Sequence, residues 1–145
     1  MDTDEARVDE QAVVPMLSYE DGLAAMEWLA RAFGFTERTR LLNQDGSLGH
    51  GEMIAGRGLV MLATAPIAAY ESPRTHRARC DQARQWSETP YIIDGVLVYV
   101  DDVDAHHERA REAGATILSP PEDGVGRLYR AEDLDGHRWM FMQRR

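Results

Sequence analysis

His50 and Glu52 form the pair of side chains best suited to chemistry in this sequence. Both lie in residues 50–55, HGEMIA, which we interpret as a strand. Side chains two residues apart on a strand leave the same face, so both groups can meet one ligand. An imidazole and a carboxylate so placed can act as acid and base, or hold a metal together with one further donor. The alternative is a polar pair that stabilises a half-exposed strand, and the sequence leaves both open.

The other histidines and the single cysteine receive structural interpretations. His107 falls on the apolar stripe of a predicted helix and is expected in the core, whereas His106 is expected to face solvent. His137 follows a turn and is interpreted as a hydrogen-bonding group of that turn. His76 and Cys80 lie four residues apart in a predicted helix and would share one face. Two groups without a third favour a structural role over a metal site or a reactive thiol.

Composition excludes several functions. The net charge of −9 argues against a surface for nucleic acid or anionic membranes, although it allows cationic ligands. One cysteine excludes an internal disulfide framework and fits a reducing compartment. The acidic N-terminus has no apolar signal region, and no apolar run approaches the length of about 20 residues that spans a membrane. We therefore expect a soluble, cytoplasmic protein.

One design of strand, acidic turn and glycine-closed helix occurs twice. The first copy has a strand at 12–19 and the second a strand at 96–100. The matching residues are the aspartates of the turns and the glycines that close the helices, Asp21 with Asp102 and Gly34 with Gly114. Asp102 or Asp104 is expected to cap the second helix. An internal repeat of this kind predicts two modules of the same fold.

Three strand-like pieces follow each helix. They are 36–43, 50–55 and 59–64 in the first copy, and 116–118, 127–132 and 137–143 in the second, with a break expected at Pro120-Pro121. The sequence therefore predicts an α+β fold, in which two βαβββ modules with curved mixed sheets form a shared cavity. The predicted divisions are a disordered leader (1–11), a first module (12–65), a helical connector (66–94) and a second module (95–145).

Four stretches resemble a known family. They are VYVDDVDAHHERAREAGA around the second turn, HGEM at 50–53, the FGF that closes the first helix, and EDLDGHRWMFM at 132–142. The sequence is identified by them as a member of the glyoxalase, bleomycin-resistance and extradiol-dioxygenase group, the vicinal oxygen chelate superfamily. Its members include lyases, dioxygenases, epimerases and metal-free drug-binding proteins, and they commonly dimerise. The resemblance thus implies a homodimer with a small-molecule ligand and leaves the activity open.

The resemblance also implies where metal ligands would stand. Those positions are Val14, Gly95, Met61 or Leu62, and Met140, and none of these side chains suits a hard divalent ion. We therefore predict no metal site and no cofactor, with a displaced divalent metal as the alternative.

The same register assigns the side chains that face a ligand. If Gly95 points inward, strand alternation sends Leu97 and Tyr99 inward too. The connector is expected to begin a helix at Ser72-Pro73, and Trp86 and Tyr91 can form either a lid or a contact with a partner subunit. The predicted ligand-binding set is Met16, Ser18, His50, Glu52, Trp86, Leu97, Tyr99, Arg138 and Met140.

Three functions fit these observations. The first is a metal-free small-molecule binding protein, which needs an apolar lining but no catalytic group. The second is a lyase or isomerase of the same superfamily that uses His50 and Glu52, with or without a displaced metal. The third is a non-catalytic dimeric scaffold, for which the sequence offers no positive feature.

Overall fold

The computed structural model describes residues 11–145, so the predicted leader falls outside the described residues except for Gln11. The side-chain amide of Gln11 donates a hydrogen bond to the Leu59 carbonyl and accepts one from the Leu59 N–H. The chain forms two compact units, which divide between Tyr70 and Glu71. Each unit is described by itself.

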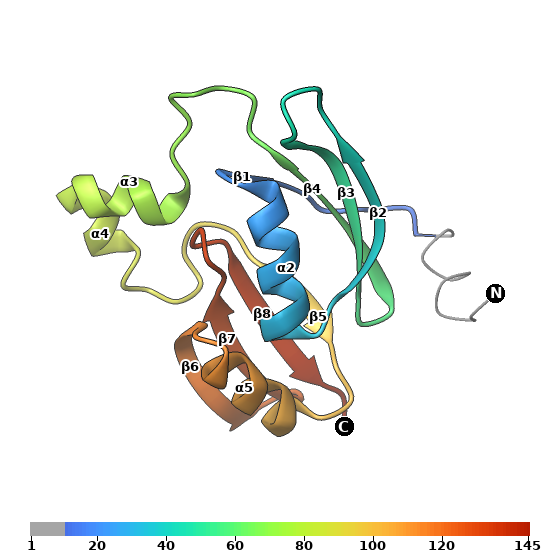
Figure 1. Cartoon of the computed structure of the whole chain (residues 1–145). Coiled ribbons are helices and arrows are strands. Elements are labelled where there is room, and N and C mark those ends of the chain that lie inside the picture. The colour runs from blue at the N-terminus through green and yellow to red at the C-terminus, as the bar shows by residue number, and fades with distance from the viewer. Residues whose placement is uncertain (1–10) are drawn as a thin grey trace. The chain divides into compact units, whose positions relative to one another are not determined.

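The first unit is a βαβββ module. Its elements are β1 (Met16–Tyr19), α2 (Gly22–Phe33), β2 (Thr36–Leu42), β3 (Leu48–Ala55) and β4 (Gly58–Thr64). The strands form one mixed sheet in the order β1-β4-β3-β2, in which β1 runs parallel to β4 and the other pairs are antiparallel. Helix α2 packs on one face of this sheet, where Gly51 of β3 approaches Met26 (Figure 1).

The second unit begins with two short helices, and the same module follows them in the sequence. Its elements are α3 (Pro73–Arg79), α4 (Asp81–Trp86), β5 (Val96–Tyr99), α5 (Val103–Glu112), β6 (Thr116–Asp123), β7 (Arg127–Glu132) and β8 (Arg138–Gln143). The sheet order is β5-β8-β7-β6, again with one parallel pair, β5 with β8. The prediction of an α+β fold built from two βαβββ modules is confirmed.

The repeated turn works through the same contacts in both units. The Asp21 side chain accepts a hydrogen bond from a first-turn amide of α2, and Asp102 does the same for α5. Gly34 and Gly114 follow the helices with φ of 73° and 97°, a conformation that favours glycine. The predicted start and end of both helices are therefore confirmed, and Asp102 rather than Asp104 is the cap.

Two predicted strand limits are wrong, and both errors involve proline. The first strand begins at Met16 instead of residue 12, directly after Pro15, which has no N–H to donate. Strand β6 continues through Pro120 and Pro121 to Asp123 where a break was expected. It can do so because β6 is an edge strand, with register shifts on both sides of Ser119.

Both sheets bury the face that carries the helix. Tyr19, Met26, Leu29 and Met53 are at most 1% exposed in the first unit. The second unit buries Val103, Tyr129, Trp139 and Phe141 to the same extent, with the Tyr129 and Phe141 rings stacked. No helix within residues 11–145 is long and apolar enough to cross a membrane.

Candidate functional site

In the first unit, the candidate residues share the sheet face opposite α2. Met16 pairs with Met61, and Met61 pairs in turn with Glu52, so the three side chains form one row across the sheet. Gly51 lies against Met26 of α2, which turns its neighbour Glu52 to the other face. Met16 and Glu52 therefore share one face of the sheet, with Met61 between them.

His50 and Glu52 are in direct contact. Nε2 of His50 lies 2.9 Å from Oε2 of Glu52, and Nε of Arg38 lies 3.8 Å from Oε1. The side chains of His50 and Glu52 are 35% and 17% exposed. Arg38 reaches the pair from an irregularity in β2, between Glu37 and Thr39. A half-buried imidazole and carboxylate at this distance can exchange a proton or bind a polar ligand group.

Ser18 lies two residues after Met16 on the same strand. Its carbonyl oxygen accepts a hydrogen bond of 3.2 Å from the Tyr70 hydroxyl. The Ser18 side chain is exposed, and strand alternation directs it to the face that carries Met16. Ser18 therefore stands beside the row that Met16 begins.

The second unit carries a hollow of about 110 Å³ on its sheet. Its lining residues are Pro90, Tyr91, Asp94, Gly95, Val96, Leu97, Arg130, Arg138, Trp139 and Met140. A row of paired residues crosses the floor, from Leu97 to Met140 and then Arg130, and Ser119 continues the row beyond the lining. Leu97 and Met140 therefore lie together as predicted, and Arg130 is a lining residue that the sequence reasoning missed.

Arg138 lines the hollow but directs its donors to the protein. Its side chain is 4% exposed. Nε donates to Glu132 over 3.0 Å, and Nη1 donates to the Thr89 carbonyl over 2.6 Å, while further bonds reach the Ser87 and Ile92 carbonyls. Arg138 thus anchors the segment that follows α4, and this segment supplies Tyr91 and Asp94 to the rim of the hollow.

Glu132 is the buried centre of this anchor. Its side chain is 1% exposed and contacts the guanidinium of Arg77 on α3 through both oxygens, one bond measuring 2.6 Å. Burial alone would raise the pKa of Glu132, but the hydrogen bonds and charges of Arg77 and Arg138 outweigh it and hold this pKa below its usual value. Arg77 of the connector therefore neutralises an internal carboxylate.

The two aromatic candidates near the hollow differ in position. Tyr91 lines it and is 70% exposed. Trp86, 43% exposed at the end of α4, is absent from the lining. Tyr99 lies on β5 beyond the hollow, where the Arg144 guanidinium sits 3.6 Å from its ring centroid. Tyr99 is thus engaged in a cation–π contact.

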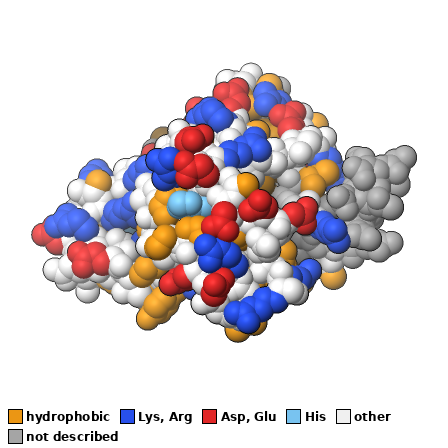
Figure 2. Space-filling view, turned by 90° about the horizontal axis from the view of Figure 1, so that it is seen from below, with side chains coloured by type: hydrophobic (Ala, Val, Ile, Leu, Met, Phe, Trp, Pro, Cys, Tyr) orange, Lys and Arg blue, Asp and Glu red, His pale blue; other side chains and the backbone are white. Residues whose placement is uncertain are grey.

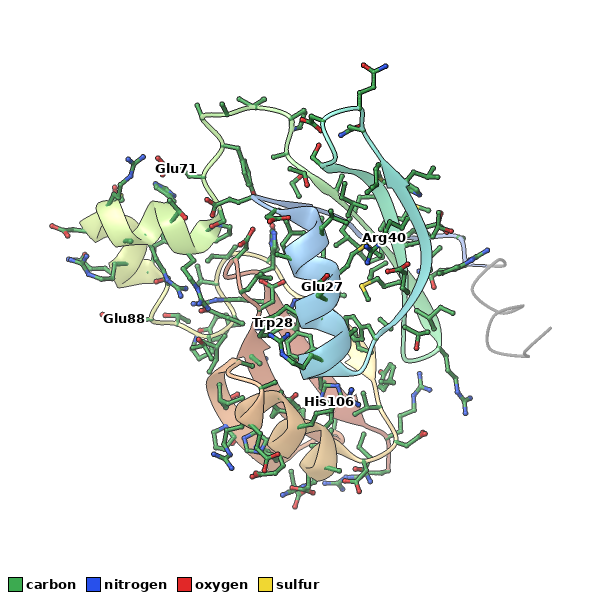
Figure 3. All side chains as sticks on the ribbon, viewed as in Figure 1. Glu27, Trp28, Arg40, Glu71, Glu88 and His106 are labelled. Carbon is green, nitrogen blue, oxygen red and sulfur yellow. The ribbon has the colours of Figure 1, made fainter. Side chains whose placement is uncertain are left out.

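The histidines of α5 correct one prediction. His106 is half-buried instead of solvent-exposed, because it lies three residues after the buried Val103 on the face toward the sheet (Figure 3). Its Nδ1 lies 2.6 Å from the Tyr129 hydroxyl, and its ring is 4.1 Å from that of Phe141. His107, expected in the core, is also half-buried and meets the Tyr129 ring edge-on. Both histidines therefore belong to the packed side of α5.

Cys80 lies between the two short helices of the connector. Cys80 has φ of −133° and ψ of 110°, an extended conformation that separates α3 from α4. His76 therefore lies on α3, and Cys80 directly follows the last residue of that helix.

The residues present do not fit the metal centre that the resemblance implies. Met61 and Met140 occupy the last-strand positions, and Gly95 has no side chain to donate. Carboxylate and imidazole donors, which a divalent ion needs, are absent from these positions. Within the described chain, no three His, Cys, Asp or Glu side chains are grouped closely enough to hold one ion.

The comparison with protein families settles the relationship of the chain. The glyoxalase/bleomycin resistance protein/dioxygenase superfamily matches residues 13–141. The chain belongs to this superfamily. Among similar structures, TioX from Micromonospora sp. ML1 is 30% identical with a TM-score of 0.67, over 92% of this chain and 95% of TioX.

Two further relatives extend this comparison. TnmS3, an antibiotic binding protein from Streptomyces sp. CB03234, is 18% identical with a TM-score of 0.58, covering 93% of this chain and 98% of TnmS3. At this identity the likeness concerns the fold alone. An uncharacterized protein of Mycobacterium tuberculosis is 29% identical over 136 residues, which make up 92% of this chain and 75% of that protein.

Proposed function

We propose that this member of the superfamily binds a small organic molecule and needs no metal to do so. The observation that carries the proposal is the row of side chains on each sheet, apolar at one end and charged at the other. Met16 and Met61 lead to Glu52 in the first unit, and Leu97 and Met140 lead to Arg130 in the second. Such a surface gives affinity through apolar contact and orientation through one polar group.

The residues at the superfamily's ligand positions support binding without a metal. Methionine thioethers and a glycine hold no hard cation but present apolar surface to an aromatic or aliphatic ligand. The relatives include one described as an antibiotic binding protein, which makes antibiotics a reasonable first class of ligand. A protein that sequesters a ligand requires affinity alone, so it needs no complete set of catalytic groups.

The test is a thermal-shift screen followed by calorimetric titration, because a ligand that binds the native state raises its melting temperature. The panel contains aromatic antibiotics, cationic glycopeptides and 2-oxoaldehyde–thiol adducts. Leu97→Ser is expected to weaken a binding compound at least fivefold, because it removes apolar contact from the hollow. Val125→Ser is the matched control, since Val125 is 93% exposed and outside the hollow. Absence of any shift across the panel would contradict the proposal.

A second candidate is a lyase or isomerase activity at His50 and Glu52. The contact of 2.9 Å between Nε2 and Oε2 favours it. If the protein is an enzyme, His50→Gln and Glu52→Gln should abolish turnover of a compound that still binds. If it is a binding protein, these variants should lower affinity, and the wild type should show no turnover. Stoichiometric metal in protein purified without a histidine tag would contradict metal-free binding and support the displaced metal site.

A further inference from the structure

Arg130 is a half-buried lining residue of the hollow whose guanidinium is in direct contact with no acidic group among the described residues. Its side chain projects from β7, and within residues 11–145 it has neither a hydrogen-bond nor an ion-pair partner. Other arginines of the same unit differ, because Arg77 and Arg138 contact Glu132, and Arg127 contacts Asp104 over 2.9 Å. Acidic and basic side chains are interspersed on the face shown in Figure 2. A guanidinium left unpaired in a protein of net charge −9 therefore stands out.

The neighbours of Arg130 suit an anion with an apolar body. Met140 and Leu97 follow it along the row and line the same hollow. On its other side, Arg130 pairs with Ser119, whose buried hydroxyl has no hydrogen-bond partner in the part of the chain that the structure describes. A guanidinium presents a planar set of donors that matches carboxylate and phosphate oxygens.

We propose that this hollow binds the anionic group, a carboxylate or a phosphate-type group, of a ligand whose apolar part lies on Leu97 and Met140. The inference rests on the proposed binding function and names the chemical class of its ligand. A volume of about 110 Å³ is smaller than the cavity of about 150 Å³ that admits benzene, so the hollow has room for an anionic group and part of a ring. The hollow therefore holds the acidic end of a ligand, and any larger remainder extends beyond it.

Asp94 is a negatively charged residue at the hollow, so its removal should change anion binding in the opposite direction to the removal of Arg130. Asp94 lines the hollow but is exposed, whereas Arg130 is half-buried. Water therefore screens the repulsion between Asp94 and an anion more than it screens the attraction between Arg130 and that anion. Removing Arg130 should therefore weaken anion binding, whereas removing the charge of Asp94 should strengthen it. A nonspecific loss of structure would move both variants in the same direction.

The experiment measures dissociation constants of the full chain at low salt by ligand-observed NMR. Four probes share one ring: phenylacetate, phenylphosphonate, neutral phenylacetamide and cationic phenethylamine. The wild type should bind both anions at least tenfold more tightly than the amide, because a charge-assisted hydrogen bond contributes a factor of about ten or more. The tighter of the two anions identifies the carboxylate or the phosphate-type group as the natural one.

Three variants at the hollow and one control outside it complete the test. Arg130→Gln should remove the preference for anions over the amide, and Arg130→Lys should restore part of it. Asp94→Asn should tighten anion binding two- to fivefold, while Arg84→Gln, on α4 outside the hollow, should change nothing. Circular dichroism and the melting temperature establish that each variant is folded.

The outcomes separate this inference from the proposed function. Equal binding of phenylacetate and phenylacetamide would overturn the inference, and so would an Arg130→Gln variant that keeps the preference for anions. Failure of all four probes to bind at 20 mM, roughly the weakest affinity a fragment of this size shows, would also overturn it. Binding of neutral or cationic compounds in the thermal-shift screen would uphold the proposed function even then. Failure of both experiments would overturn both.

Discussion

Replacing Glu132 by glutamine should loosen the segment that shapes the hollow. The carboxylate contacts Arg77 on α3 and Arg138 on β8, and Arg138 in turn holds the Thr89 and Ser87 carbonyls. Glutamine has nearly the same shape but no charge, and its amide group turns donors toward a guanidinium. Glu132→Gln therefore leaves Arg77 and Arg138, and the more distant Arg74 at 3.8 Å, without their anion.

The burial of these groups sets the magnitude. The side chains of Glu132, Arg138 and Arg77 are 1%, 4% and 22% exposed, so little water is available to replace the lost charge. Breaking a buried ion pair by removing one partner costs about 3–5 kcal/mol. Because glutamine keeps one acceptor oxygen, Glu132→Gln should lower the free energy of unfolding by about 3 kcal/mol, the lower end of this range. For a chain of this size the melting temperature should fall by roughly 6–12 °C.

The assay is urea unfolding followed by circular dichroism, with melting as a second measure. Its pH dependence gives an independent check. Because the pKa of Glu132 is lower in the folded protein than its usual 4.5, the carboxylate stabilises the fold fully above that pH. This stabilisation is lost as the pH falls through the folded pKa. The difference in free energy of unfolding between wild type and Glu132→Gln should thus stay constant at neutral pH and become smaller below about pH 4.5.

A surface pair provides the control for this ion network. Arg84 and Asp81 also contact each other, but their side chains are 55% and 83% exposed. Arg84→Gln should change stability by less than about 1 kcal/mol, as exposed pairs do. If Glu132→Gln costs no more than Arg84→Gln, or if the gap does not change with pH, the argument from buried charge is refuted.

Three further substitutions test the local structure, each by urea unfolding. Asp102→Ala should cost about 1 kcal/mol because α5 loses its N-terminal cap. Gly126→Ala should cost about 1–3 kcal/mol, since a Cβ there would lie 2.5 Å from the backbone carbonyl oxygen of Gln143. Tyr129→Phe should cost about 0.5–1.5 kcal/mol, because it removes the hydroxyl that lies 2.6 Å from Nδ1 of His106.

Neighbouring positions serve as controls for two of these substitutions. Gly124→Ala places its Cβ 3.8 Å from the nearest non-neighbouring atom, an ordinary contact, so it should change stability far less than Gly126→Ala. Asp101 precedes the capping residue and makes no cap contact, so Asp101→Ala should be nearly neutral. Equal effects within either pair would contradict the assigned contact.

The repeated module could be predicted because its signals are local. An aspartate that caps a helix and a glycine that closes it act through contacts within a few residues, so Asp21, Gly34, Asp102 and Gly114 are recognisable in the sequence. Strand alternation is equally local, and it is sufficient to predict that the side chains of His50 and Glu52 leave the same face of β3 and can meet.

The errors and omissions depend on contacts that are distant in the sequence. Nothing near Glu132 identifies Arg77 as its partner, 55 residues away. Pro120 and Pro121 are compatible with β6 only because that strand lies at the edge of its sheet, which sequence order does not reveal. Arg130 could have been found, since it stands two residues from Glu132, the same spacing that indicated His50 and Glu52.

The two modules keep the same row of residues but not the same charge. Glu52 pairs with Met61 in the first sheet, and Arg130 pairs with Met140 in the second, so a carboxylate and a guanidinium occupy equivalent positions. Glu52 contacts His50 and forms an ion pair with Arg38, while Arg130 has no such partner within the described residues. The duplicated fold therefore supplies two similar surfaces with different chemistry. We expect the second to select the charge of the ligand and the first to supply any proton transfer.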